Sequence, residues 1–228
     1  MPRKLTAAVF VSLDGVMQAP GGPTEDPTGG FRFGGWTAPF DDESGQRFMA
    51  PLFEGEHDLL LGRRTYDIFA GYWPYHQDVP VGAAFQRVNK FVATHADRLL
   101  EWENSHRLKG ELPEAVARLK ASEGRDVQIW GSSTLYPPLL AAGLIDQMTL
   151  IIHPVLLGNG KRVFGGGEKG RAAPPGSYRL TRHAVSDTGV IGASYEPAGE
   201  VRTGSVGPEG EPSKAELRRR EAIKEGSW

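Results

Sequence analysis

The sequence predicts an α/β fold: a three-layer sandwich with a mostly parallel central sheet, antiparallel strands at one edge and helices on both faces. Two observations lead to this prediction. Short apolar runs typical of buried strands alternate with segments of helical periodicity through the first two thirds of the chain. Two β-rich segments then follow each other without a helix between them, which is typical of an antiparallel hairpin.

The first strand is expected at 5–13 and stops at Asp14-Gly15. The loop at 18–40 that follows is rich in glycine and proline, and it contains three large aromatic residues. Loops of this length inside a compact domain are usually functional, so we expect it to cover a crevice as a lid. Asp41 or Asp42 can then cap a helix with one apolar face.

The run "LLLGRRTY" at 59–66 predicts a fully buried strand that turns at Gly62 into a helix. The remaining pattern predicts, in order, a strand at 90–94, a helix from Pro113, a strand at 126–131, a helix capped by Ser132 or Ser133 and ended by Gly143, a strand at 148–158 in which Pro154 implies an edge or a bulge, and a closing hairpin over 177–197.

Composition narrows the class of protein. The 228 residues include 26 basic and 28 acidic side chains, so no net positive field favours nucleic acid or an anionic membrane. Cysteine is absent, which excludes disulfides, thiolate catalysis and cysteine-ligated zinc. The histidines lack helical metal spacing, and we expect no metal site. We see no signal peptide and no apolar stretch of about 20 residues, so we expect a soluble, cytoplasmic protein.

The composition changes near residue 197. We therefore expect one domain over 1–197 and a charged, weakly structured tail over 198–228, because the tail has few large apolar residues to offset its ordering entropy. A short helix at 213–225 with Ser213 as its cap fits the pattern.

Polar or small residues follow three of the predicted strands: Gly62-Arg63-Arg64-Thr65, Thr94-His95 and Gly131-Ser132-Ser133-Thr134. The carboxyl ends of neighbouring parallel strands share one crevice, where ligands bind. A glycine turn that leads into a helix N-terminus with arginine suits phosphate. The alternative for the first group is a capped helix with two solvated arginines. Together, the three groups favour a ligand with several phosphates, or a nucleotide.

The segments "VSLDGVM", "LLLGRRTY", "VQIWGSSTLYPPLLAAGLID" and "IIHPVLLGNGKRVF" resemble the dihydrofolate reductase superfamily. They are most similar to the branch of the C-terminal reductase domain of the bifunctional riboflavin-biosynthesis enzyme, which also occurs as stand-alone bacterial proteins. The resemblance covers about residues 3–197 and implies a dihydrofolate-reductase-like sandwich, NADPH as cofactor and a homodimer. It implies that Arg63 and Thr65 hold adenosine-side phosphates, that Thr94 helps with the 2′-phosphate, and that 131–134 lie against the pyrophosphate and nicotinamide.

Two departures from the family limit what is carried over. The family often has Gly-Gly where this chain has Gly131-Ser132. Dihydrofolate reductases also carry a carboxylate on the helix before the Gly-Arg-x-Thr strand, whereas here Asp42 and Glu43 are expected as caps and Gln46 faces the cleft. A neutral amide cannot protonate a substrate, so we do not expect dihydrofolate to be reduced.

Asp14, at the end of the first strand, is the candidate catalytic acid. An Asp-Gly turn with no chemistry is the alternative of equal weight. His153 is expected to be structural, and Tyr72 and Trp73 either line the substrate side or pack in the core.

The sequence thus predicts an NADPH-dependent reductase that transfers hydride to a small heterocyclic or carbonyl substrate. The phosphoribosylamino-pyrimidine of riboflavin biosynthesis is one candidate substrate. The alternative is a non-catalytic nucleotide-binding or interaction module on the same fold. An open, polar nicotinamide end of the crevice favours the enzyme, and a plugged one favours the module. A homodimer would also cover the apolar strand at 148–157, which we expect near the sheet edge.

Overall fold

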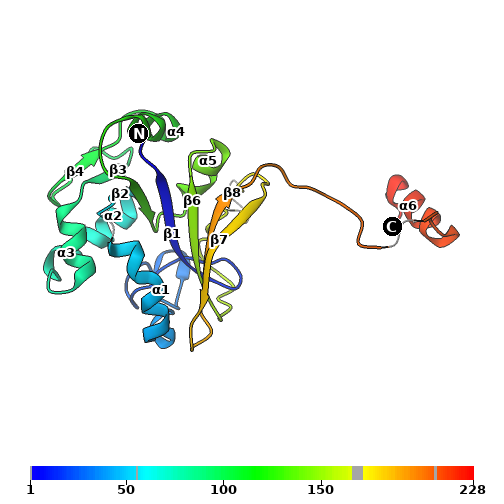
Figure 1. Ribbon diagram of the computed structural model, residues 1–228, viewed down its shortest axis with the longest axis horizontal. Coiled ribbons are helices and arrows are strands. Elements are labelled where there is room, and N and C mark those ends of the chain that lie inside the picture. Colours follow the sequence, from blue (N-terminus) through cyan, green and yellow to red (C-terminus); the bar gives the residue numbers. More distant parts are fainter. Residues whose placement is uncertain (1, 55, 166–171, 208–209) are drawn as a thin grey trace.

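The computed structural model of the chain describes residues 2–54, 56–165, 172–207 and 210–228. Its centre is an eight-stranded sheet in the order β4-β3-β2-β5-β1-β6-β8-β7 (Figure 1). Strands β1 to β6 pair in parallel, whereas β8 runs antiparallel to both β6 and β7. The strands are β1 (Leu5–Ser12), β2 (Asp58–Gly62), β3 (Lys90–Ala93), β4 (Ser105–Arg107), β5 (Val127–Trp130), β6 (Gln147–His153), β7 (Tyr178–Val185) and β8 (Ile191–Pro197).

Helices cover both faces of the sheet, as Figure 1 shows, so the predicted three-layer α/β sandwich is confirmed. One face packs against α1 (Glu43–Glu54), α2 (Arg63–Ala70) and α3 (Pro80–Arg87), and the other against α4 (Leu112–Ala121) and α5 (Tyr136–Ala141). Three short 3-10 turns lie in the connections: η1 (Thr28–Gly30), η2 (Ala38–Phe40) and η3 (Trp73–Tyr75).

The leucine run of β2 is buried on both faces of the sheet. Leu60 packs into the core under α4 and α5, while Leu59 and Leu61 pack into the core under α2 and α3. Side chains alternate across a strand, so a strand between two helical layers needs apolar residues at every position. This is why the run reads as continuous rather than alternating.

The structure corrects the prediction for the strand at 148–158. β6 ends at His153, and Pro154 lies beyond it. β6 also lies between β1 and β8 rather than at an edge, so its backbone is paired on both sides. The edges are β4 and β7. The exposed-strand argument for a homodimer was therefore wrong, and the dimer stays a prediction that rests on the resemblance.

Three further local features differ from the sequence predictions. The strand β4 and the helix α3 were not predicted, because both are short and lack a strong apolar pattern. The helix α5 begins at Tyr136 with Leu135 at its N-cap position, so neither Ser132 nor Ser133 caps it. Ser132 has a different role, described below.

The C-terminal segment ends in α6 (Lys214–Glu225), which lies apart from the sandwich at the end of an extended stretch (Figure 1). Ser213 caps it as predicted, since its hydroxyl oxygen accepts a hydrogen bond from the Glu216 N–H at 3.2 Å. Leu217 and Ile223 are exposed. Within the described part of the chain, no helix is both long and apolar enough to cross a membrane.

Candidate functional site

A cavity of about 780 Å³ lies at the carboxyl ends of β1, β2 and β5. Three segments that are far apart in the sequence line it: the start of the loop after β1, the turn at 62–65, and the loop at 131–134. The predicted meeting of strand ends is therefore found for β2 and β5. The lining includes Gly62, Arg63, Arg64, Thr65, Gly131, Ser132, Ser133 and Thr134 from the predicted set.

The first turn of α2 presents its backbone N–H groups without a side-chain cap. Gly62 is the N-cap residue, and no side chain accepts a hydrogen bond at that helix end. Uncapped N–H groups and the positive end of the helix dipole make such a terminus suitable for an anion.

The two arginines beside this terminus differ in their surroundings. Arg63 is half-buried, and its Nε donates to both carboxylate oxygens of Asp67, at 2.8 and 3.0 Å. A further N–H reaches the Arg98 carbonyl oxygen at 3.4 Å. Arg64 is exposed and makes no hydrogen bond or ion pair to any residue that the structure describes. Arg64 is thus the more available cation, and Arg63 the more rigidly placed one.

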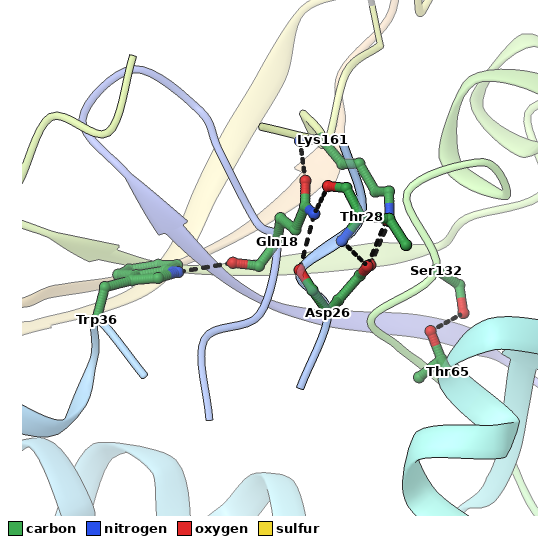
Figure 2. Close-up of polar contacts among 7 residues, drawn as sticks. All are labelled: Gln18, Asp26, Thr28, Trp36, Thr65, Ser132 and Lys161. Atoms are coloured by element: carbon green, nitrogen blue, oxygen red, sulfur yellow. Dashed lines mark hydrogen bonds and ion pairs between the residues drawn. The ribbon is translucent and has the colours of Figure 1, made fainter. Parts of the chain in front are cut away.

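Ser132 joins the two phosphate-type loops. Its Oγ accepts a hydrogen bond from the Gly62 N–H at 2.7 Å and donates to Thr65 Oγ1 at 2.9 Å (Figure 2). Ser132 adopts a positive φ of 63° to do so, a region that favours glycine. At Gly131, with φ of 56°, an added Cβ would lie 2.8 Å from Thr65 Cγ2. The serine that departs from the family's Gly-Gly pair is therefore an integral contact of this site.

Thr94 and His95 are not brought into the cavity wall. They follow β3, which lies on the far side of β2 from β5. The Thr94 Oγ1 accepts a hydrogen bond from the Ala96 N–H at 3.1 Å, and this segment reaches the site only through the Arg98 carbonyl beside Arg63. The expectation that three strand ends share one cavity was wrong for β3.

The loop after β1 covers the cavity, in the place predicted for a lid. Gln18 holds it: its side-chain Nε2 donates to the Asp26 and Thr28 carbonyls at 2.9 and 2.8 Å (Figure 2). Its Oε1 accepts from the Lys161 N–H at 3.1 Å, and its backbone carbonyl accepts from Trp36 Nε1 at 2.8 Å.

Lys161 also forms an ion pair with the carboxylate of Asp26 and donates to Thr28 Oγ1 at 2.9 Å. Burial opposes ionisation of Asp26, but the contacts from Lys161 and Thr28 prevail and lower its pKa below the usual range. The loop is therefore tied to the segment that follows β6. Gln18 and Lys161 were not identified as site residues from the sequence, because a lone polar side chain in a loop gives no periodic signal.

Asp14 lies outside the cavity wall. Its carboxylate accepts hydrogen bonds from Ser12 Oγ at 2.7 Å, from the Leu157 N–H at 3.1 Å and from the Gly158 N–H at 2.9 Å, and it pairs with Arg162 at 3.2 Å. Burial opposes its ionisation, but the hydrogen bonds outweigh it and lower the pKa of Asp14 to about 2. A carboxylate that stays ionised at neutral pH cannot donate a proton, so the structure favours the turn over the catalytic acid.

Glu25 is a carboxyl group in the cavity wall that the sequence analysis missed. Its Oε2 accepts hydrogen bonds from the Gly21 and Gly22 N–H groups at 2.6 and 3.2 Å. Burial nevertheless raises the pKa of Glu25 above its usual value. The only sequence signal was an acidic residue inside the expected lid, in "PTEDPTGG".

The inner end of the cavity is aromatic. Phe53 stacks on Trp130 with ring centroids 5.1 Å apart and an interplanar angle of 11°. Phe69 stacks on Phe85 at 5.6 Å, and Trp73 meets both of these rings edge-on. Trp73 therefore both packs in the core and lines the cavity, while the neighbouring Tyr72 is half exposed and stacks on His76.

A smaller cavity of about 320 Å³ shares Phe10 and Thr37 with the large one. His153 lies in its wall, with Phe10, Trp36 and Phe40 around its ring, and burial lowers its pKa. Asp42 accepts a hydrogen bond from the Gly45 N–H at 2.6 Å, as expected for a cap. The side chain of Gln46 donates to Asp41 at 3.1 Å.

No cluster of three or more histidine or acidic side chains suited to a metal ion occurs in the described ranges. That no metal is needed stays a prediction.

The comparisons with known proteins agree with this geometry. A family model described as the RibD C-terminal domain matches residues 3–191. A putative riboflavin biosynthesis protein from Shewanella sp. PV-4 is 21% identical with a TM-score of 0.60, covering 87% of this chain and 99% of its own.

Two enzymes of solved structure share the fold at lower identity. Dihydrofolate reductase from Enterococcus faecalis, complexed with NADP(H), is 15% identical with a TM-score of 0.52, over 85% of this chain and 96% of that one. The Thermotoga maritima diaminohydroxyphosphoribosylaminopyrimidine deaminase/5-amino-6-(5-phosphoribosylamino)uracil reductase is 14% identical with a TM-score of 0.55, over 86% of this chain and 57% of that one. Because the family model spans most of its length, the chain belongs to the RibD C-terminal domain family and has a dihydrofolate-reductase-like fold.

Proposed function

We propose that the protein is an NADPH-dependent reductase that transfers hydride to a small heterocyclic or carbonyl substrate. One observation carries the proposal. A single cavity has an uncapped helix N-terminus with two arginines at one end and a wall of aromatic rings at the other. A dinucleotide with phosphates at one end and a nicotinamide ring at the other matches both ends.

The residues present fit the phosphate half of such a cofactor. The first-turn N–H groups of α2 and the guanidinium of Arg63 or Arg64 would hold phosphate oxygens, because charge-assisted hydrogen bonds to phosphate are strong. Thr65 would add its hydroxyl, and the loop from Gly131 to Thr134 would lie along the cofactor. When bound, NADPH supplies the hydride; the protein orients the two rings and excludes water.

Reduction of a C=N or C=O bond also needs a proton. Glu25 replaces Asp14 as the candidate donor, because its carboxyl group lies in the cavity wall and burial raises its pKa. A general acid works best when its pKa approaches the working pH. Asp14 instead positions the turn after β1 and the segment at 157–162.

The competing function is a nucleotide-binding module without catalysis. The open volume of the cavity favours an enzyme, while its apolar inner end does not meet the expectation of a polar one. Deuterium transfer decides between the two. With NADPH carrying deuterium at C4 of the nicotinamide, a reductase transfers the label to a reduced product, whereas a module binds the cofactor and leaves the label in place across a panel of heterocycles, quinones and carbonyl compounds.

A cytoplasmic homodimer is part of the proposal, and the resemblance supports it. Light scattering at micromolar concentration tests the dimer: a mass twice the 24.8 kDa of the chain supports it, and a mass of one chain contradicts it.

A further inference from the structure

We propose that the substrate is a flat, unphosphorylated aromatic ring system, bound against the aromatic inner wall of the cavity, and that the wall provides no site for a substrate phosphate. The inference rests on the proposed reductase function and narrows its substrate class. It separates this chain from a reductase of phosphoribosylated pyrimidines, although the fold is shared.

The first argument is the geometry of the inner wall. Phe53 and Trp130 lie parallel, and Phe69 and Phe85 form a second stacked pair. Trp73 stands edge-on to that second pair. Rings prefer offset-stacked or edge-to-face neighbours, and aromatic side chains accept any planar base or ring without reading its hydrogen-bond pattern. A wall of this kind selects for planarity and against bulky saturated groups.

The second argument is the charge of the cavity wall. Its described basic side chains are Arg63, Arg64 and Lys161, and its acidic ones are Glu25, Asp26 and Asp67. Lys161 is paired with Asp26, and Arg63 with Asp67. Only Arg64 lacks a partner within the described chain, and it lies at the cofactor end beside α2.

NADPH uses up this positive charge. Its pyrophosphate and 2′-phosphate carry several negative charges, while the described lining has three basic and three acidic side chains. The helix terminus and the arginines would serve the cofactor. A phosphate on the substrate would then meet the cofactor's anions and the carboxylate of Glu25 without a free cation to offset them, which disfavours it.

A matched ligand pair tests the inference. Riboflavin and FMN carry the same flat ring system, and only FMN has a phosphate. Each is titrated into the full-length protein saturated with NADP⁺, which fills the cofactor end and prevents turnover. The readout is the flavin's own fluorescence, which is quenched when the ring stacks on an aromatic side chain.

We expect riboflavin to be quenched and to bind at least as tightly as FMN. Tighter binding of FMN by tenfold or more would show a phosphate site and overturn the inference. Absence of quenching by either flavin would overturn the flat-ring class. Failure of the proposed function is separate: it appears as absent NADP⁺ binding in a titration without flavin.

A pair of variants on α1 locates the binding site. Phe53→Leu removes the ring that stacks on Trp130 and should weaken riboflavin at least about fivefold, the lower end of the effect of one stacking contact. Phe48→Leu makes the same change on the same helix, but Phe48 lines the smaller cavity. Its riboflavin affinity should match the parent. Equal affinity in Phe53→Leu and the parent would place the flavin elsewhere and overturn the inference.

Discussion

The hydroxyl of Ser132 donates a hydrogen bond to Thr65 Oγ1 across 2.9 Å, which ties the loop after β5 to the first turn of α2. The same oxygen accepts the Gly62 N–H, so one side chain fixes both phosphate-type turns. The contact also explains the close approach of Gly131 to Thr65, where an added Cβ would find no room. The two turns therefore form one rigid unit before any ligand binds.

Ser132 should tolerate glycine better than alanine. Alanine keeps the positive φ and leaves the buried Gly62 N–H without its acceptor, which should cost about 1–3 kcal/mol of unfolding free energy. Glycine loses the same hydrogen bonds but recovers about 1 kcal/mol of backbone strain. Urea unfolding should thus rank the parent first, Ser132→Gly second and Ser132→Ala last. An alanine variant as stable as the parent would mean that the bridge contributes nothing.

Arg63 should select NADPH over NADH. Arg63→Ala should weaken NADPH by about 10- to 150-fold, the value of one charge-assisted bond of roughly 1.5–3 kcal/mol, and leave NADH nearly unchanged. Thr65→Ala should weaken both cofactors modestly. Asp67→Asn should strengthen NADPH, because it frees the guanidinium that Asp67 now holds.

Arg64→Ala is the matched comparison for Arg63. We expect a smaller loss, because its exposed side chain must give up more conformational freedom to bind. A larger loss than in Arg63→Ala would move the role to Arg64. Equal NADPH affinity in all these variants would make both arginines surface charges beside a helix.

The sequence predicted the order of strands and helices well where the chain is buried on both sides. The leucines of β2 and the apolar residues of β1 and β5 repeat a pattern that only a covered sheet explains. Prediction failed where neighbours along the sheet decide the outcome. That β6 is interior and that β3 lies away from the cavity follow from strand order, which no local pattern contains.

The site could be predicted only as far as backbone motifs define it. Glycines and arginines after β2 and β5 identified the cofactor end, since their turns are local. Glu25, Gln18 and Lys161 escaped because their roles come from contacts across more than 100 residues or within an irregular loop. Asp14 was weighed equally as acid and turn, and only its four partners in space decided the matter.

Lys161 should control how firmly the cavity loop is held. Lys161→Met removes the ion pair with Asp26 and the hydrogen bond to Thr28, so the loop should open more often. Trypsin should then cut after the exposed Arg32 several-fold faster, as followed by mass spectrometry. Lys109→Met, at an exposed position away from the loop, controls for the lost lysine. Unchanged cleavage at Arg32 would mean that Gln18 holds the loop without the ion pair.

Arg3 and Asp58 form a buried ion pair at the end of the sheet opposite the cavity. Their charged atoms lie 2.6 Å apart, and the side chains are 3% and 2% exposed. Arg3→Met leaves the Asp58 carboxylate buried without its cation, which should lower the unfolding free energy by about 3–5 kcal/mol. Arg47→Met breaks a surface pair, with side chains 70% and 93% exposed, and should change it by less than about 1 kcal/mol. Similar losses in both variants would contradict this assignment.

Glu25 should give the reaction an acidic requirement. A proton donor works only while protonated, so kcat should fall as pH rises through the pKa of Glu25. Burial raises that pKa, so the fall should lie above the ordinary range of about 4.3 for glutamate. Glu25→Gln cannot donate a proton and should lower kcat by about 10²–10⁴-fold and abolish this limb of the profile, with the Kd for NADPH unchanged.

Asp14→Asn provides the contrast for Glu25. The pKa of Asp14 is about 2, so its carboxylate stays ionised throughout the assay range and cannot produce the limb. The asparagine variant loses the pair with Arg162 and should be less stable, but it should keep the pH profile of the parent at a temperature where it is folded. If the limb disappears in Asp14→Asn and persists in Glu25→Gln, the proton comes through Asp14, and the role assigned to Glu25 is wrong. If both variants keep it, water delivers the proton and the wall only positions the rings.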